Sequence, residues 1–354
     1  IWLKKINEEL DKHNQENPDN PAAPYAVNHI VHKSNIRLEY NNSDFEFVGI
    51  SDLGRPDTLC YLLQNDSLHG KFDHKVQCSG STMDVDGKSI EIYPGYSPSE
   101  IPWDKIDIDV VIDSTGVIWD DNELKHYNSN AKLTVITSNT NYDFDRIVIP
   151  GINDDSISKD DSIISPSSST TQALALMLDV LDSGFGIQNS MMTTVHAYTA
   201  DQPLADDTKF RTRRSRSAVE NIIPNHSESP KIIEKILPKF KGKIAGIALN
   251  VPTPNGSCVD LTSELDRIPK IEEVNELFKS ASENSHKNII GFTDDPIVST
   301  DAVGILETMV FDSKATMIAS NHFLKTICWY DNGWGFSKRI LETILAYNNL
   351  GGKF

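Results

Sequence analysis

Two short stretches carry residue types that could act together in nucleophilic catalysis. The first is a run of hydroxyl residues, 168–171, at the start of a predicted helix, and the second is His196 in a predicted strand. A serine activated by a histidine can attack an ester, so a Ser169–His196 pair would suggest a hydrolase. No cysteine stands near Ser169 in the sequence, so this run offers hydroxyl groups and no thiol.

A structural role competes for Ser169. Ser169 and Gln172 have the spacing of a capping box, in which the hydroxyl bonds the Gln172 amide and the Gln172 side chain reaches back. Pro166 stands upstream, and helix-forming residues follow from Ala173. We therefore predict that Ser169 caps the helix and does no chemistry, with the Ser169–His196 hydrolase as the alternative.

The elements that position these residues fall into two halves. The first half contains short, β-branched and nearly continuously apolar stretches at 45–52, 109–116, 132–138 and 146–152. Segments with a helical pattern, such as 57–66, lie between some of them. Strands of this kind are typical of a parallel sheet that is covered on both faces. The first half is therefore predicted to be an α/β domain.

The second half begins with a predicted helix from Ser169 to about Leu181. Predicted strands follow at 189–200, 243–255, 257–266 and 315–331, and predicted helices at 271–284 and 337–349. Several of these strands alternate apolar and polar residues, as antiparallel strands do. We expect an antiparallel sheet with helices on it, and a final helix that returns to the first domain.

Composition excludes several classes of protein. The formal net charge of -18 argues against nucleic-acid binding, which needs a basic face. No apolar run is long enough to span a bilayer. The four cysteines, Cys60, Cys78, Cys258 and Cys328, form no CxxC pair, which excludes a zinc knuckle or thioredoxin motif. We expect four reduced, mostly buried thiols and no metal site.

A set of motifs in fixed order resembles glyceraldehyde-3-phosphate dehydrogenase. The motifs are QNDSLHGKF (64–72), DSTGV (113–117), SSTTQALAL (168–176), TTVHAYTADQ (193–202), NIIP (221–224), NVPTPN (250–255), VDLT (259–262) and WYDNGWGFSKR (329–339). The match runs from about residue 45 to the C-terminus. The resemblance implies a Rossmann-type NAD domain, a catalytic domain, a thiol nucleophile, a histidine that activates it, and anion sites.

The resemblance places the nucleophile and the base at Ser169 and His196. A serine hydroxyl is harder to ionise than a thiol, and a thioester intermediate has no easy oxygen counterpart. Loss of the thiol should therefore abolish the family's oxidation. His196 is then expected to be a packed, hydrogen-bonded residue with no thiol to activate.

The cofactor positions implied by the resemblance are only partly kept. Asp52 stands where an adenosine-ribose acid is expected and Asn332 where the nicotinamide amide would be held, and the turn Ser114, Thr115, Gly116 is also kept. The glycine-rich phosphate loop should precede 45–52, but the chain has no glycine before Gly49, and 25–38 occupies that place. We expect weak NAD binding or none, and so no cofactor.

The anion positions implied by the resemblance are also altered. Ser168, Thr199 and Arg216 remain. Asn250 stands where an arginine is expected, and Glu228 stands in a phosphate pocket, where its carboxylate would repel the ligand.

These observations give a predicted domain plan: an arm at 1–24, a degenerate Rossmann-type parallel-sheet domain at 25–168 with 337–354, and an α+β catalytic-type domain with an antiparallel sheet at 169–336. Several functional elements differ from those that the resemblance implies, whereas the motifs that pack the fold are kept. We therefore expect a pseudoenzyme that serves as a structural or accessory subunit of a larger, possibly mitochondrial assembly.

Three alternatives to that expectation stay open. The first is a divergent NAD(P)-dependent aldehyde oxidoreductase, and the second is the Ser169–His196 hydrolase. The third is a location in the cytoplasm in place of a mitochondrion or another organelle. The expected partners are other protein subunits, with a homo-oligomer possible, and neither nucleic acid nor a membrane span is expected.

Overall fold

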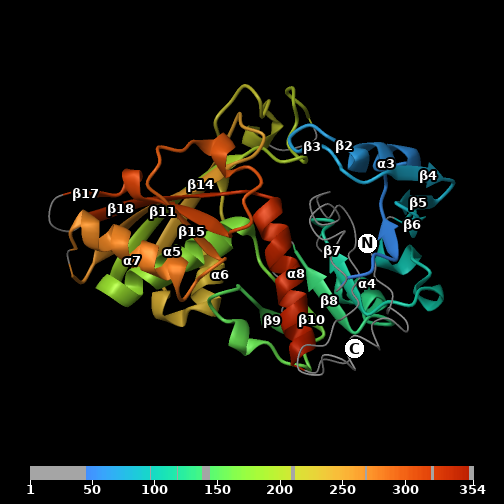
Figure 1. Cartoon of the computed structure of the whole chain (residues 1–354), viewed down its shortest axis with the longest axis horizontal. Helices are drawn as coiled ribbons and strands as arrows, with labels where there is room; N and C mark the ends of the chain where they lie inside the picture. The colour runs from blue at the N-terminus through green and yellow to red at the C-terminus, as the bar shows by residue number, and fades with distance from the viewer. Residues whose placement is uncertain are drawn as a thin grey trace. The chain divides into compact units, whose positions relative to one another are not determined.

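The computed structural model describes residues 45–350 apart from 96, 118, 138–143, 209–211, 268 and 320–322. The chain divides into two compact units, each coloured along the sequence in Figure 1. Unit 1 comprises Ile1–Val148, Asp154–Ser167 and Ser337–Phe354, and unit 2 comprises Ile149–Asn153 and Ser168–Phe336. The predicted arm at 1–24 and the segment 25–38 lie outside the described residues.

Unit 1 contains a parallel sheet made of apolar strands. Its order is β7-β8-β10-β9, with bounds β7 Val110–Asp113, β8 Leu133–Ile136, β10 Ile163–Ser165 and β9 Arg146–Ile147. All residues of β7 and β8 are buried, as expected of strands covered on both faces. Helix α4, Asp121–Tyr127, is capped by Asp120, whose carboxylate accepts from the amides of Asn122 and Glu123.

A second group of strands in unit 1 is mostly antiparallel. Its order is β1-β6-β5-β4, with bounds β1 Gly49–Ser51, β6 Lys88–Tyr93, β5 Thr82–Val85 and β4 Val76–Ser79. Only β1 and β6 pair in parallel. Strands β4, β5 and β6 were not predicted, because short strands joined by tight turns show little periodicity. Helix α3, Pro56–Gln64, follows β1, and the pair β2 (Asn65–Asp66) and β3 (Gly70–Lys71) follows α3.

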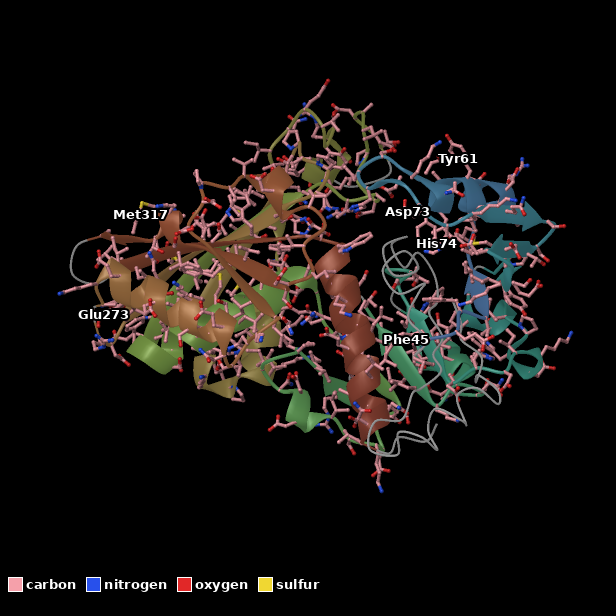
Figure 2. The ribbon with its side chains drawn as sticks, viewed as in Figure 1. Phe45, Tyr61, Asp73, His74, Glu273 and Met317 are labelled. Carbon is pink, nitrogen blue, oxygen red and sulfur yellow. A yellow bond between two sulfur atoms is a disulfide. The ribbon has the colours of Figure 1, made fainter. Side chains whose placement is uncertain are left out.

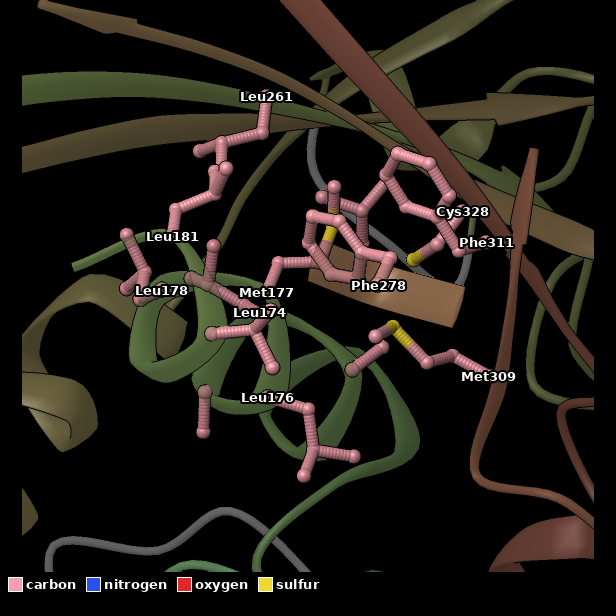
Figure 3. Close-up of a cluster of buried hydrophobic side chains, with 14 of the residues drawn as sticks. Leu174, Leu176, Met177, Leu178, Leu181, Leu261, Phe278, Met309, Phe311 and Cys328 are labelled. Atoms are coloured by element: carbon pink, nitrogen blue, oxygen red, sulfur yellow. The ribbon is translucent and has the colours of Figure 1, made fainter. Parts of the chain in front are cut away.

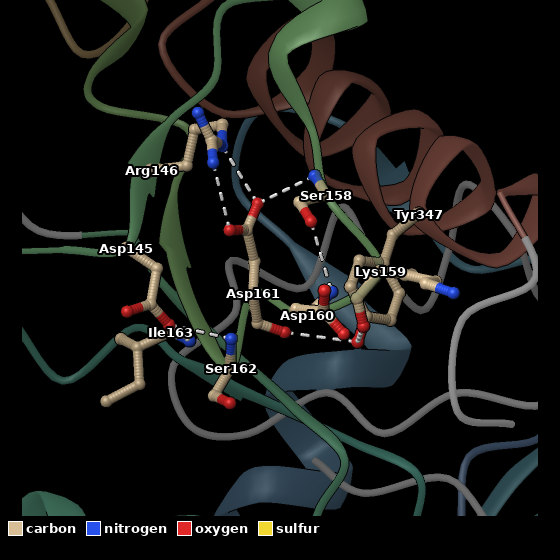
Figure 4. Close-up of polar contacts among 9 residues, drawn as sticks. All are labelled: Asp145, Arg146, Ser158, Lys159, Asp160, Asp161, Ser162, Ile163 and Tyr347. Atoms are coloured by element: carbon tan, nitrogen blue, oxygen red, sulfur yellow. Dashed lines mark hydrogen bonds and ion pairs between the residues drawn. The ribbon is translucent and has the colours of Figure 1, made fainter.

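Side chains join the strands of unit 1 to its last helix, α8, Trp334–Asn349. Asp161 makes a two-point ion pair with Arg146, with its Oδ2 2.9 Å from Nε and its Oδ1 3.1 Å from Nη2. The Tyr347 hydroxyl of α8 donates to the carbonyl oxygens of Lys159 and Asp161 at 3.2 and 3.1 Å (Figure 4). The end of α8 is therefore fastened to the segment that leads into β10.

Unit 2 is built on one large mixed sheet. Its order is β12-β13-β11-β14-β18-β16-β15, with β17 paired to β18. The bounds are β11 Ile187–Ala197, β12 Ile223–His226, β13 Ile244–Val251, β14 Ser257–Leu265, β15 Ile290–Thr293, β16 Met309–Asp312, β17 Met317–Ala319 and β18 Phe323–Tyr330. β11 pairs with β13, and β15 with β16, in parallel, so the prediction of a purely antiparallel sheet was too simple.

Three helices pack on one face of this sheet and enclose the core. They are α5 Ser169–Phe185, α6 Ser229–Ile236 and α7 Ile271–Glu283, and Figure 1 shows them together beside β11, β14 and β18. Leu174, Leu178 and Leu181 of α5 are fully buried, and Phe278 of α7 stacks on Phe311 with ring centroids 3.8 Å apart (Figure 3). The apolar face of α5 therefore anchors the helix whose first turn carries Ser169.

The predicted fold class is confirmed: a Rossmann-like unit with a parallel sheet is followed by a unit with a mixed, largely antiparallel sheet. The cysteine prediction was wrong for two residues, because Cys60 of α3 and Cys78 of β4 form a disulfide. Tyr61 of α3, which Figure 2 labels, is exposed, whereas its neighbour Cys60 is buried. Cys258 and Cys328 are free and buried, as expected.

No helix among the described residues is long and apolar enough to cross a membrane. In the same part of the chain, His, Cys, Asp and Glu side chains form no group that could hold a metal ion.

Candidate functional site

The first turn of α5 is held by Ser168. Ser168 has extended backbone angles and its hydroxyl accepts from the Thr171 amide at 3.3 Å, which makes Ser168 the N-cap. The prediction that Ser169 caps α5 was therefore wrong by one residue. Ser169 is the first helical residue, and its half-buried hydroxyl is left without the capping role.

The Ser169–His196 dyad, the alternative to the capping role, is not formed in the structure. In the described part of the chain, the hydrogen-bond partners of His196 are Ala197 and Asn332, and Ser169 is not among them. A serine nucleophile needs a base within hydrogen-bond reach to lose its proton. The structure gives the hydrolase alternative no such contact.

The tautomer of His196 follows from its short contact at Nδ1. Its Nδ1 lies 2.6 Å from the carbonyl oxygen of Ala197, which can only accept, so Nδ1 carries a hydrogen. Burial lowers the pKa of His196, and the Ala197 contact and the charge of Asp201 oppose that effect. A neutral imidazole with a hydrogen on Nδ1 has its lone pair on Nε2, the atom that could take a proton from a substrate.

The side-chain amide of Asn332 lies against the His196 ring. Its Nδ2 is 3.0 Å from Nε2 and 3.4 Å from Nδ1, so it does not lie along the lone pair of Nε2. Asn332 Oδ1 accepts from the Ser257 hydroxyl at 2.8 Å. Ser257 is fully buried, and its Oγ accepts from the Ala197 amide at 2.9 Å. Gly256 precedes Ser257 with φ +80°, and a Cβ there would stand 1.9 Å from the Ser299 carbonyl oxygen, so only glycine lets β14 start at this place.

A buried tyrosine connects the start of α5 with the strand of His196. The Tyr330 hydroxyl lies 2.7 Å from Thr170 Oγ1 and 2.9 Å from Thr194 Oγ1. The Tyr330 ring packs edge-on to the His196 ring, with centroids 6.2 Å apart. Burial raises the pKa of Tyr330 well above its ordinary value, so this hydroxyl stays protonated and serves as a fixed hydrogen-bonding link.

No cysteine of the chain can supply an activated thiolate at this site. All four cysteines are among the described residues, and two of them are joined in the disulfide. Burial, with a contribution from Asp260, raises the pKa of Cys258 to about 11, and burial raises that of Cys328 further. Both free thiols are therefore protonated and buried, unlike a reactive cysteine.

The expected anion positions lie in different surroundings. Asn250 is buried on β13 beside His196, and its Nδ2 donates to the Ala197 carbonyl oxygen at 3.4 Å. Thr199 donates to Asp201, which also pairs with Arg214. These groups add no net positive charge beside His196.

Two further charged groups lie among these positions. The exposed Arg216 forms an ion pair with Asp206 at 2.9 Å, in which both side chains face solvent. Glu228 is bonded to His226 at 2.6 Å and to Lys231 at 3.1 Å. Neither contact leaves an uncompensated cation for an anionic ligand.

The described cofactor positions of unit 1 lie in turns that follow its parallel strands. Asp52 follows β1, and its Oδ1 accepts from the Gly54 amide at 2.6 Å, which fixes the carboxylate at the carboxyl end of the strand. Ser114, Thr115 and Gly116 follow β7, and the Thr115 amide donates to Asp113. Gly116 has φ +71° and open space where a Cβ would stand, so the backbone can be approached closely there.

Comparisons with known proteins show which family the chain belongs to. The C-terminal domain model of glyceraldehyde 3-phosphate dehydrogenase matches residues 168–332, and the NAD binding domain model of the same enzyme matches residues 31–121. "Glyceraldehyde-3-phosphate dehydrogenase 1" of Trichormus variabilis is 39% identical over 316 residues, covering 88% of this chain and 92% of that protein. The chain belongs to the glyceraldehyde-3-phosphate dehydrogenase family.

Other relatives within the glyceraldehyde-3-phosphate dehydrogenase family are equally similar. "Glyceraldehyde-3-phosphate dehydrogenase 1" of Bacillus subtilis is 38% identical over 314 residues, covering 88% of this chain and 93% of that protein. "Glyceraldehyde-3-phosphate dehydrogenase A" of Escherichia coli is 38% identical over 311 residues, covering 87% of this chain and 93% of that protein.

These comparisons overturn three predictions. A non-catalytic structural subunit is wrong, because the relatives are named as dehydrogenases over most of the chain. The expectation of no cofactor is wrong, because the match includes the family's NAD binding domain. A mitochondrial assembly is not supported either, because these relatives are bacterial enzymes.

Sequence reasoning found His196, Asn332 and Asn250, which the structure brings together around Ala197, but it missed Ser257 and Tyr330. Tyr330 lies in the motif WYDNGWGFSKR (329–339), which also contains Asn332. That motif was the signal from which Tyr330 could have been found. Ser257 had none, because its contacts with Ala197 of β11 and with Asn332, which follows β18, join segments that are far apart in the sequence.

Proposed function

We propose that this chain is a divergent NAD(P)-dependent aldehyde oxidoreductase that works without a cysteine nucleophile. The observation that carries the proposal is His196, held neutral with its lone pair on Nε2, in a chain of the glyceraldehyde-3-phosphate dehydrogenase family. Ser169 stands where the resemblance implies the thiol, and the chain's free thiols are buried and protonated. The oxidation is therefore assigned to base catalysis on the substrate itself.

The cofactor positions of unit 1 support dinucleotide binding. Asp52 would accept hydrogen bonds from ribose hydroxyls, and Gly116 would let the dinucleotide approach the backbone after β7. Bound NAD(P) would supply the two-electron acceptor, so that a hydrated aldehyde loses a hydride and a proton and leaves as a carboxylic acid. The chain's own residues must then orient the substrate and remove the proton.

His196 would remove that proton through Nε2. General base catalysis is most efficient when the base is unprotonated at the working pH, and the burial of His196 favours its neutral form. The Ala197 carbonyl oxygen bonds Nδ1 and would stabilise the imidazolium that forms. Asn250 offers a neutral amide beside this base, so the polar end of the substrate would meet a hydrogen-bonding group here without a cation.

Turnover of a panel of aldehydes by the full chain tests this proposal. We expect NAD+ or NADP+ to be reduced in the presence of an aldehyde, and we expect the Ser169→Ala variant to keep this activity. Ester hydrolysis that disappears in Ser169→Ala would favour the hydrolase instead. Failure to reduce either cofactor with any aldehyde of the panel would contradict the proposed oxidoreductase.

A further inference from the structure

The Cys60–Cys78 disulfide joins the helix that follows β1 to the last strand in the order β1-β6-β5-β4. Cys60 belongs to α3, which packs on β4 and β5, and Cys78 belongs to β4. Cys60 is buried, whereas Cys78 is only half-buried. A thiol reagent in solution would therefore reach this bond at the Cys78 sulfur.

Each sulfur of this disulfide lies beside a carbonyl oxygen that a thiol could use. Cys60 Sγ is 3.6 Å from the Gln77 carbonyl oxygen, and Cys78 Sγ is 3.0 Å from the Pro56 carbonyl oxygen. A disulfide sulfur carries no hydrogen, whereas each thiol that reduction forms has one S–H to donate. Both thiols would find an acceptor close by, so the fold accommodates the reduced pair as well as the bonded one.

The last turn of α3 is held to the β4 segment independently of the disulfide. The Gln64 side chain donates from Nε2 to the Phe72 carbonyl oxygen at 2.8 Å, and its Oε1 accepts from the Val76 amide at 2.9 Å. Leu63 of the same turn is buried. Reduction should therefore release the first turn of α3 while the last turn stays in place.

That first turn lies between the disulfide and the turn that carries Asp52. The Gly54 amide donates to Asp52 Oδ1, and a Cβ on Gly54 would stand 3.0 Å from Cδ2 of Leu59, the residue before Cys60. Within the described residues, the N-cap Arg55 makes no side-chain capping bond, so α3 begins without this common source of stability. The covalent bond at Cys60 therefore limits how far Leu59 and the Asp52 turn can move.

We propose that Cys60 and Cys78 form a reversible redox switch that sets the cofactor affinity of unit 1. The disulfide form holds the Asp52 turn ready for NAD+, and the dithiol form binds NAD+ more weakly. This inference rests on the proposed function for its ligand, because Asp52 is the residue assigned there to the ribose. The difference in affinity comes from pre-organisation, since a turn that is already fixed loses less freedom when a ligand binds.

Reduction by a small dithiol moves two electrons and two protons to the protein. A thiolate of the dithiol attacks Cys78 Sγ and forms a mixed disulfide, while Cys60 leaves as a thiolate and takes a proton. The second thiol of the reagent then displaces Cys78, which becomes a thiol, and the reagent leaves as a cyclic disulfide. Cys258 and Cys328 are already thiols, so this reaction does not change them.

Titration calorimetry of the full chain with NAD+, before and after treatment with dithiothreitol, tests the switch. The temperature is one at which circular dichroism shows that both forms are folded. Reduction should raise the Kd for NAD+ by about fivefold or more, the usual size of coupling between two sites. Equal Kd values for the two folded forms would overturn the switch.

The double variant Cys60→Ser, Cys78→Ser is the matched control. It keeps a hydroxyl donor at each position and cannot form the bond, so it should bind NAD+ like the reduced wild-type protein and should not respond to dithiothreitol. A response of this variant as large as that of the wild type would overturn the assignment to this pair of cysteines.

Linkage gives a reciprocal measurement on the wild-type protein alone. If oxidation strengthens NAD+ binding, saturating NAD+ must favour the disulfide by the same factor. The ratio of oxidised to reduced chain, measured in mixtures of reduced and oxidised dithiothreitol, should rise accordingly. An unchanged ratio with NAD+ bound would overturn the switch even if the double variant failed to fold.

Hydrogen exchange followed by NMR tests the structural part of the switch without a cofactor. Reduction should speed exchange of the Gly54 amide, which is bonded to Asp52, and should leave the Val76 amide, which Gln64 holds, nearly unchanged. Equal exchange of the Gly54 amide in both forms would overturn the switch. Failure of either form to bind NAD+ would count against the proposed oxidoreductase, while the exchange rates still decide whether reduction loosens the Asp52 turn.

Discussion

At the scale of single residues, His196 decides what the site can do. Its Nδ1 lies 2.6 Å from the Ala197 carbonyl oxygen, which can only accept, so its tautomer follows from hydrogen-bonding rules. Ser169, which the sequence analysis treated as the centre of the question, has no such contact with His196 among the described residues. The chemistry therefore depends on the base more than on the hydroxyl.

The first prediction concerns the loss of this base. His196→Asn should lower kcat/KM for aldehyde oxidation by roughly a hundredfold to ten-thousandfold, because general base catalysis contributes about that much. The variant should keep the melting temperature of the wild-type protein within a few degrees. His126→Asn, which changes an exposed histidine of α4, is the matched control and should behave like wild type. Similar rates for the two variants would remove His196 from the mechanism.

A second prediction follows from the direction of the His196 pKa. Burial lowers it below the ordinary 6.5, so the acid limb of kcat/KM against pH should have its midpoint below 6.5. In the interval between the lowered value and 6.5, the unfolded chain binds more protons at this residue than the folded chain does. The free energy of unfolding should therefore fall as pH decreases through that interval.

This second prediction is checked by urea unfolding at several pH values in wild type and in His196→Asn. The variant lacks the titrating group, so its stability should depend less on pH in the same interval. Equal pH dependence in the two proteins would show that His196 is not titrating with a lowered pKa.

At the scale of elements, the two serines at the start of α5 are expected to contribute differently to the stability of the protein. Ser168→Ala should lower the free energy of unfolding by about 1 kcal/mol, because the Thr171 amide loses its cap. Ser169→Ala is the neighbouring control and should cost much less, because Ser169 is the first helical residue. Urea unfolding of both variants measures the difference, and a larger loss in Ser169→Ala would restore the original capping prediction.

The link between α3 and β4 gives another prediction at this scale. The Cys60–Cys78 disulfide closes a loop of 18 residues in sequence, so its reduction should lower the free energy of unfolding by about 3 kcal/mol. Unfolding with and without a dithiol reductant measures this effect. The double variant Cys60→Ser, Cys78→Ser is the control and should not respond to the reductant. A wild-type protein that is equally insensitive would show that the two thiols are not bonded.

Strongly periodic elements could be predicted from the sequence, and contacts between distant residues could not. Strand β11 and helix α7 were placed to within about three residues, since their apolar periodicity is set by the core that they face. The pairing of Cys60 with Cys78 and the hydrogen bond of the Ala197 amide to Ser257 Oγ arise only when separate elements come together. The parallel pair β11 and β13 was missed for the same reason, since strand direction within a sheet leaves no local signal.

At the scale of the whole molecule, the main prediction that was wrong is the absence of a cofactor. The missing glycine loop was predicted from residues that lie outside the described part of the chain, whereas Asp52 and the turn at Gly116 are described. The NAD binding domain model of the family matches residues 31–121, which overturns the expectation of no cofactor. Cofactor binding is therefore a measurable property on which the proposed function depends.

The last prediction is that the full chain binds NAD+ with a heat measurable by titration calorimetry, and that Asp52→Ala weakens this binding by roughly tenfold. The carboxylate at the end of β1 is the expected partner of the ribose hydroxyls. Asp52→Asn is the matched control for the turn, because its amide oxygen can still accept from the Gly54 amide while the charge is lost. If Asp52→Asn binds like wild type, the turn geometry matters more than the charge. If Asp52→Ala also binds like wild type, the ribose contact must lie elsewhere in unit 1.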